Sequence, residues 1–163
     1  MSRQYHVKLE KERLVFSAAH FITYADDICE PLHGHNYHVS AEIHGELDDN
    51  QYVIDFIALR DTLQTIVDEL DHRMLLPTGH PTIRVDSSDN EVEVTHGERR
   101  WVFPAADCTV LPIANTTAEL LAKYIGNQLL DRLEQRYQMR PADVRIGVDE
   151  CDGQWAFCHL TDE

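Results

Sequence analysis

Residues 35–47 read HNYHVSAEIHGEL, and this stretch decides the class of fold. Its apolar side chains fall on every second residue, at Tyr37, Val39, Ala41 and Ile43, with polar side chains between them. Such alternation is typical of a β-strand with one buried and one polar face. We therefore expect a half-buried antiparallel strand here.

A second strand is expected upstream. Residues 5–19 alternate loosely and end in the apolar run LVFSAA, and the polar loop TYADDICEP follows. If the two strands pair as a hairpin, His20 at the end of the first lies near the start of the second.

The period of the apolar residues changes after residue 55. Asp55 is a plausible helix N-cap, and we expect the helix to end near Asp71 and His72. Its apolar positions recur at helical spacing. They are Phe56, Leu59, Leu63, Ile66, Val67 and Leu70.

A second helix is predicted near residue 117. Thr116, Thr117, Ala118 and Glu119 match the capping-box pattern, with Thr116 as the cap and Glu119 reaching back. An apolar stripe follows this start. It comprises Leu120, Leu121, Tyr124, Ile125, Leu129, Leu130 and Leu133.

The remaining segments complete an α+β domain. VRIGVDE and QWAFCHL flank the turn residues Cys151-Asp152-Gly153 and predict a closing hairpin. Between the helices, EVEVTHGERRWVFP predicts an extra hairpin insert around residues 80–112, with its turn at His96-Gly97 and the extended segment VLPIA after it. The order is strand, strand, helix, insert, helix, strand, strand, in a single domain over residues 1–163.

Composition restricts the class of protein. The chain has 163 residues and 43% hydrophobic residues, without an apolar run of the roughly 18 residues that a membrane helix needs. The start lacks the apolar core of a secretory signal, so we expect a cytoplasmic protein without a membrane partner. A net charge of −15 argues against a general nucleic-acid binder. The four cysteines do not form a CxxC pair, and a disulfide framework is not expected.

Three histidines suggest a metal site. His33 and His35 are two residues apart on extended backbone, so their side chains point the same way, and the predicted hairpin brings His20 near them. Three imidazoles without a fourth protein ligand is the arrangement of a catalytic zinc site. The alternative is that each histidine caps a loop or forms hydrogen bonds within the hairpin.

Cys29 and Glu30 precede the histidine pair. Close to zinc and an imidazole, the pKa of the Cys29 thiol should fall, which would make it a base or a nucleophile. Otherwise Cys29 is a buried loop residue or a fourth ligand of a structural zinc. Glu30 is the other candidate base, or a solvated loop acid.

Two further acidic positions have alternative roles. Asp71 can orient His72 as a proton shuttle opposite Cys29, or His72 only complements the helix C-terminus. Glu150 flanks the last turn, or its carboxylate accepts paired N–H groups from an aminopyrimidine-like ring.

Taken together, these residues resemble the 6-pyruvoyl-tetrahydropterin synthase/6-carboxy-tetrahydropterin synthase family. The matching pieces occur in the family's order and span nearly the whole chain. They are FSAAH (16–20), CEPLHGHNY (29–37), VIDF (53–56), LDH (70–72), NTTAE (115–119) and VDE (148–150). The segment at 77–112 is longer than in compact family members, and NTTAE stands where proline-threonine forms are common.

The resemblance implies a tunnelling fold (T-fold), in which ββααββ subunits complete a barrel as a trimer and two trimers stack into a homo-hexamer. It implies active sites between subunits. The implied zinc ligands are His20, His33 and His35. The implied general base is Cys29, with Asp71 and His72 as the proton relay.

The implied substrate is 7,8-dihydroneopterin triphosphate, with Glu150 anchoring the pterin ring and Thr116 and Thr117 lining the pocket. The spacing Cys-x-x-x-His-Gly-His resembles the branch that forms 6-carboxy-5,6,7,8-tetrahydropterin for queuosine-type deazapurine synthesis. Glu30 occupies the place where a sister branch uses a glutamate to form 6-hydroxymethyl-dihydropterin. The remaining alternatives are the pyruvoyl product and a pterin-binding or metal-binding protein without turnover.

Overall fold

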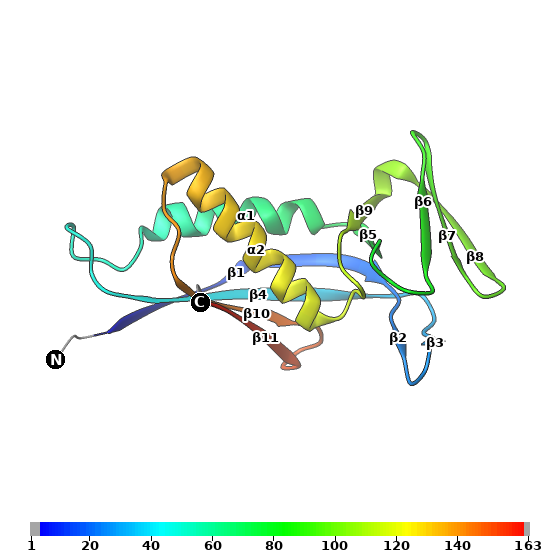
Figure 1. The fold of residues 1–163 in the computed structure, drawn as a ribbon, viewed down its shortest axis with the longest axis horizontal. Coiled ribbons are helices and arrows are strands. Elements are labelled where there is room, and N and C mark those ends of the chain that lie inside the picture. The colour runs from blue at the N-terminus through cyan, green and yellow to red at the C-terminus, as the bar shows by residue number, and fades with distance from the viewer. Residues whose placement is uncertain (1–3, 162–163) are drawn as a thin grey trace.

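The computed structural model describes residues 4–161 and has an elongated shape, with two helices on one face of a six-stranded sheet (Figure 1). The helices are α1 (Phe56–Leu70) and α2 (Ala118–Tyr137). The sheet order is β11-β10-β4-β1-β5-β9. The bounds of its strands are β1 (Tyr5–His20), β4 (His33–Gly45), β5 (Arg73–Pro77), β9 (Cys108–Leu111), β10 (Asp143–Asp149) and β11 (Trp155–Thr161).

The alternating stretch forms β4, as predicted. Tyr37, Val39, Ala41 and Ile43 are buried on the face that the helices cover. β1 pairs with β4 in antiparallel register, and an irregularity between Glu10 and Val15 interrupts the pairing. The closing hairpin of β10 and β11 adds to the other edge of β4. The predicted α+β order of elements is confirmed.

The first helix begins where the sequence predicts. The Asp55 carboxylate accepts hydrogen bonds from the backbone N–H groups of Ile57 and Ala58, which α1 would otherwise leave unsatisfied. The predicted apolar stripe is buried except at its first member. Phe56 is 49% exposed and borders a hollow between α1 and β1.

The predicted cap of the second helix is wrong by one residue. Thr117 is the N-cap of α2, and its side chain makes no capping hydrogen bond. Thr116 is fully buried instead, and its hydroxyl donates to the carbonyl of Phe21. The capping-box pattern therefore located the helix start to within one residue. The Thr116 hydroxyl does not cap the helix because it is hydrogen-bonded to Phe21.

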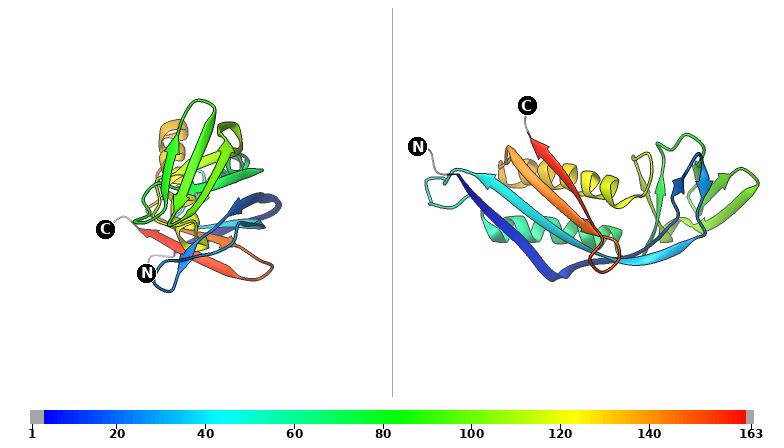
Figure 2. Two further views of the ribbon diagram at one scale, coloured as in Figure 1. Left: turned by 90° about the vertical axis from the view of Figure 1, so that its right-hand side faces the viewer. Right: turned by 90° about the horizontal axis from the view of Figure 1, so that it is seen from below.

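The insert is more extensive than one hairpin. It forms a three-stranded sheet, β6-β7-β8, at the end of the molecule away from the termini (Figures 1 and 2). The short hairpin β2-β3, which belongs to the loop between β1 and β4, lies at the same end. Their bounds are β2 (Thr23–Tyr24), β3 (Ile28–Cys29), β6 (Arg84–Ser87), β7 (Glu91–His96) and β8 (Arg99–Pro104), with a 3-10 turn at Ala105–Asp107. The predicted turn at His96-Gly97 is confirmed, since Gly97 has a φ of 57°.

One strand of the main sheet, β5, was not predicted, and β9 was predicted only in part, by the extended segment VLPIA that includes Val110 and Leu111. β5 follows α1 directly and pairs in parallel with the end of β1, and β9 pairs in parallel with β5. Both segments are short and show little alternation, which explains why β5 was missed and why the start of β9 was not located. They link the main sheet to the insert.

The buried residues form two clusters. The larger lies between the sheet and both helices. The smaller lies under the insert and contains Phe21, Cys29 and Met74, packed against Trp101 and Phe103. The loop between β1 and β4 and the insert thus share a second, smaller core. None of the helices in residues 4–161 is both long and apolar enough to cross a membrane.

Candidate metal centre and its surroundings

Three histidines converge where β1 ends and β4 begins. His20 is the last residue of β1 and pairs in register with His33, the first residue of β4. His35 lies two residues further along the same strand, so its side chain is on the same face. One ligand atom from each of the three imidazoles lies within 4.8 Å of the others. This juxtaposition confirms the predicted pairing of the two strands.

Backbone carbonyls orient two of the three rings. The Nδ1–H of His20 donates to the carbonyl of Thr116 at 2.9 Å, and the Nδ1–H of His33 donates to the carbonyl of Pro31 at 2.9 Å. A proton fixed on Nδ1 leaves the lone pair of Nε2 free. This is the second-shell arrangement that fixes the tautomer of a metal-binding histidine.

Burial keeps His20 neutral. Its side chain is fully buried, and desolvation, aided by the nearby His33 and His35, lowers its pKa to about 4. The Tyr37 hydroxyl lies 3.2 Å from both ring nitrogens of His20, and burial raises the pKa of that hydroxyl. Neutral imidazole is the form that binds zinc, so the donor set fits a zinc ion.

Gly34 sets the spacing of the two strands at this point. A Cβ at this position would lie 3.1 Å from the carbonyl oxygen of Ala18 on β1. Only glycine allows the backbones to approach this closely without displacement.

Glu150 follows β10 and faces the histidines. Its Oε1 atom lies 3.5 Å from Nε2 of His20 and 3.9 Å from Nε2 of His35. It also lines a hollow of about 540 Å³ with Thr117, Gln154 and Trp155. A carboxylate beside the histidines can therefore accept hydrogen bonds from a ligand in this hollow. Sequence reasoning did not identify Trp155 as a residue that borders this hollow.

The two candidate bases differ in their surroundings. An oxygen of the Glu30 carboxylate lies 3.9 Å from Nε2 of His33. The Cys29 side chain is 8% exposed and packs among apolar residues, and its thiol donates to the Glu30 carbonyl at 3.5 Å. Cys29 is not among the converging ligand atoms of the described residues.

The expected fall in the pKa of Cys29 depends on zinc bound nearby and stays a prediction. Burial raises the pKa of the Cys29 thiol, although the Arg99 guanidinium acts in the opposite direction. Sequence spacing could not anticipate this, because most apolar side chains in the cluster that contains Cys29 come from the insert. Arg99 was likewise missed, since it lies seventy residues along the chain from the thiol.

Asp71 and His72 form the expected pair at the end of α1. One oxygen of Asp71 accepts the backbone N–H of Ser17 at 2.7 Å, and the other lies 2.8 Å from Nδ1 of His72. The Ser17 hydrogen bond is the main cause of the lowered pKa of Asp71. The His72 side chain is 83% exposed. It lines a groove of about 590 Å³ that also borders His35.

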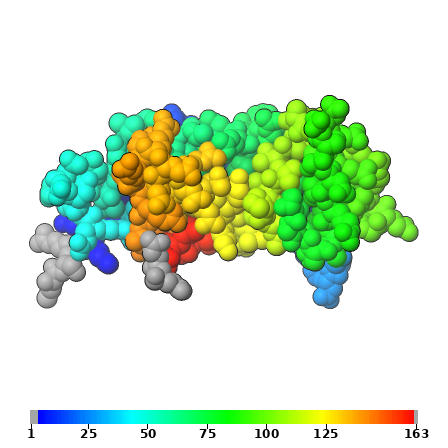
Figure 3. Space-filling view, turned by 45° about the horizontal axis from the view of Figure 1, so that its top comes forward, coloured from blue at the N-terminus to red at the C-terminus, as the bar shows by residue number. Residues whose placement is uncertain are grey.

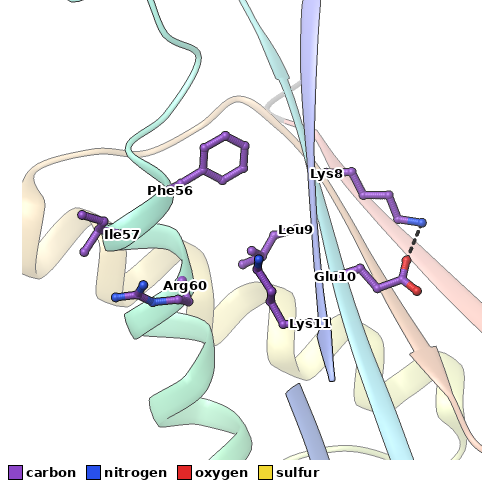
Figure 4. Close-up of a pocket in the computed structure, with 7 residues that line it drawn as sticks. All are labelled: Lys8, Leu9, Glu10, Lys11, Phe56, Ile57 and Arg60. Carbon is purple, nitrogen blue, oxygen red and sulfur yellow. Dashed lines mark ion pairs between the residues drawn. The ribbon is translucent and has the colours of Figure 1, made fainter. Parts of the chain in front are cut away.

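A separate hollow lies between β1 and the first turn of α1 (Figure 4). Its volume is about 370 Å³. Phe56 and Ile57 border it opposite Lys8 and Glu10, which form an ion pair at 2.6 Å. It contains none of the predicted site residues.

The chain is similar to known proteins over nearly its whole length. The family model described as 6-pyruvoyl tetrahydropterin synthase matches residues 8–160. A protein of Methanocaldococcus jannaschii with the provisional name 6-carboxy-5,6,7,8-tetrahydropterin synthase is 33% identical over 144 residues, which cover 88% of each chain.

Solved structures agree with this match. 6-Pyruvoyl tetrahydropterin synthase of Plasmodium falciparum has a TM-score of 0.87 and 31% identity, covering 98% of this chain and 99% of that one. The Plasmodium vivax protein has a TM-score of 0.89 and 27% identity, covering 99% of this chain and 100% of that one. The matched P. vivax chain is a variant in which a glutamate, described as a catalytic residue, is replaced by alanine.

Proposed function

The chain belongs to the 6-pyruvoyl tetrahydropterin synthase family, and from that premise we propose that it is a zinc-dependent lyase converting 7,8-dihydroneopterin triphosphate to 6-carboxy-5,6,7,8-tetrahydropterin. Triphosphate and acetaldehyde leave in this reaction. The product serves the synthesis of queuosine-type 7-deazapurines.

The convergence of the three histidines is the observation that carries this proposal. A binding protein for a pterin would not need three imidazoles within 4.8 Å of one another, two of them oriented by backbone carbonyls. The choice of the carboxy product rests on the spacing from Cys29 to His33 and on the relative from M. jannaschii.

His20, His33 and His35 would hold the zinc ion. Zinc bound there supplies Lewis acidity, which polarises substrate oxygens and stabilises the negative charge that develops when an adjacent carbon loses a proton. The Thr116 carbonyl and the Tyr37 hydroxyl contact Nδ1 of His20 and help to orient its ring. The protein itself supplies the groups that move the protons.

Cys29 acts as the general base in this proposal, and the Asp71–His72 pair relays the second proton. The Asp71 carboxylate accepts the Nδ1–H of His72, which leaves Nε2 to exchange a proton with the substrate. To act as a base, Cys29 must first lose its own proton, and burial makes this harder because it raises the pKa of the thiol. A charged group beside the thiol is therefore needed for the reaction.

Glu150 anchors the pterin. Its carboxylate can accept two N–H groups from the aminopyrimidine edge of the ring in the hollow that Thr117 and Trp155 border. Thr116 contributes through its carbonyl to His20 rather than through its buried hydroxyl. Thr117 lies at the wall of the pterin site, whereas the expected lining role of Thr116 is replaced by its support of the His20 ring.

A second product is favoured by the position of Glu30. Its carboxylate faces His33 at 3.9 Å, whereas the Cys29 thiol is buried in the apolar cluster. The P. vivax relative carries a glutamate described as catalytic. With Glu30 as the base, the same scaffold would cleave the side chain to 6-hydroxymethyl-dihydropterin.

We further propose that the site is completed by another copy of the chain, in a homo-hexamer of two trimers. The exposed His72 in an open groove supports this assembly, because a proton relay needs a closed site to act on one substrate atom. The proposed assembly requires neither a nucleic acid nor a membrane partner.

A product assay tests the proposal. Zinc-loaded protein, Cys29→Ala and Glu30→Gln are each incubated with 7,8-dihydroneopterin triphosphate, and mass spectrometry identifies the pterins and released aldehydes. We expect carboxy-tetrahydropterin and acetaldehyde from the wild type and from Glu30→Gln, and none from Cys29→Ala. Hydroxymethyl-dihydropterin that disappears in Glu30→Gln would move the function to the second candidate. No pterin product from any of the three would contradict both.

A further inference from the structure

The loop that carries Cys29 and Glu30 has a strained tip. Three consecutive residues between β2 and β3 have positive φ angles: Ala25 at 39°, Asp26 at 59° and Asp27 at 85°. Such angles are unfavourable for residues with a Cβ and persist when surrounding contacts impose them. The contacts that hold this loop therefore matter for where the two candidate bases point.

The insert supplies those contacts. Nε2 of His96, at the end of β7, lies 3.0 Å from the Asp27 carboxylate. Thr82 donates its hydroxyl to the same carboxylate. His80 lies 2.6 Å from the Thr23 hydroxyl through Nε2, while its Nδ1 accepts backbone N–H groups. In Figure 3 the insert and the loop lie side by side at one end of the molecule.

Arg99 makes the contacts nearest to the candidate bases. It is the first residue of β8, and its Nη1 atom donates to the Cys29 carbonyl at 2.9 Å and to the Glu30 carbonyl at 3.2 Å. One guanidinium nitrogen thus fixes two consecutive peptide groups. The same guanidinium lowers the pKa of the Cys29 thiol, because its positive charge offsets part of the free-energy cost of burying a thiolate.

We propose that Arg99 is a positioning residue of the active site, which fixes the backbone of Cys29 and Glu30 and places a positive charge beside the Cys29 thiol. This role rests on the proposed function, because it concerns the base of that reaction. Through Arg99, the insert would take part in positioning the catalytic base. The core sheet holds the three histidines, and the insert holds the base.

The adjacent Arg100 provides a matched control. It is in the same strand, is also exposed, and forms an ion pair with Glu93 of β7 instead of contacting the loop. Arg100→Gln therefore removes the same charge from the same strand. A difference between Arg99→Gln and Arg100→Gln reports the contact with Cys29 and Glu30 rather than the loss of an arginine.

The test is the pH dependence of Cys29 alkylation in the zinc-loaded full chain. Iodoacetamide labels the thiolate, and peptide-level mass spectrometry reads Cys29 separately from the other three cysteines. The readout is the pH of half-maximal rate, because a loosened loop changes access at every pH alike. In Arg99→Gln we expect this pH to rise by about 0.5 to 1 unit, which is about three- to tenfold less thiolate at a given lower pH.

Turnover provides the second readout. We expect Arg99→Gln to lower kcat by about tenfold with little change in KM, because a displaced base affects the chemical step more than binding. Arg99→Lys keeps the charge but does not reproduce the guanidinium geometry, so its kcat should also fall while its alkylation profile stays nearer the wild type. If Arg99→Gln does not fold, an unchanged kcat in Arg99→Lys overturns the proposal.

The two levels of inference can be separated. Coincident alkylation profiles for Arg99→Gln and Arg100→Gln overturn the role of Arg99, whether or not the protein forms product. A shifted profile for Arg99→Gln alone supports the contact with the thiol. If the same protein then forms no carboxy product, the proposed function fails while the effect of Arg99 on Cys29 stands.

Discussion

Protonation of His20 should make the metal-free protein lose stability as the pH falls. Its pKa is about 4 in the folded chain against an ordinary value of 6.5. The unfolded chain therefore binds more protons between these values, and linkage requires stability to rise with pH across this window. The stability contribution is fully present above pH 6.5 and is lost progressively toward pH 4.

The magnitude follows from the same two values. The difference of 2.5 units between 6.5 and about 4 corresponds to about 3.4 kcal/mol in full. Integrated over the titration, this gives a loss of about 2 kcal/mol by pH 5 and about 3 kcal/mol by pH 4. Full burial of the ring supports a shift of this size.

Denaturant unfolding of EDTA-treated protein from pH 7.5 to pH 4 measures this loss. His20→Asn removes the titrating ring, and its amide can still donate to the Thr116 carbonyl. His38→Asn removes an exposed histidine of β4 and is the matched control. We expect the free energy of unfolding to fall less steeply with pH in His20→Asn than in the other two proteins. Parallel curves for all three would refute the reasoning.

Three further changes test the surroundings of the site. His33→Ala should abolish zinc binding and the rise in thermal midpoint that zinc gives the wild type, read by metal analysis and calorimetry, since one of three ligands is lost. Asp71→Asn should lower kcat by at least tenfold while changing stability by about 1 kcal/mol, because an amide no longer holds His72 as a carboxylate does; an unchanged kcat would contradict the relay. Gly34→Ala should cost about 1 to 2 kcal/mol in urea unfolding and weaken zinc binding, since its Cβ would meet the carbonyl of Ala18 at 3.1 Å. Gly45→Ala, with an ordinary contact at 3.5 Å, is its control.

Sequence patterns predicted the parts of the fold that depend on local periodicity. Alternation located β4, and Asp55 marked the start of α1. β5 was missed because five residues with four consecutive buried side chains have no alternation. The capping-box interpretation of Thr116 failed because its hydroxyl bonds to Phe21, a contact that only the folded chain creates.

The candidate site divides in the same way. Three histidines on two paired strands could be predicted, since the strand register brings His20 opposite His33. The carbonyls that orient their rings could not, because Thr116 lies 96 residues from His20. The burial of Cys29 could not be predicted either. Nothing in the sequence of the insert indicates that it packs against the loop that carries Cys29.

The geometry of β3 has a consequence for how the two candidate bases are used. Consecutive residues on extended backbone point in opposite directions, and Cys29 ends this strand with its side chain in the apolar cluster. Glu30 accordingly turns toward His33. The backbone thus directs the Glu30 carboxylate toward His33 and the Cys29 thiol toward the apolar cluster and Arg99. Arg99, bonded to both carbonyls, opposes rotation of these peptide groups, so it holds both candidate bases in this arrangement.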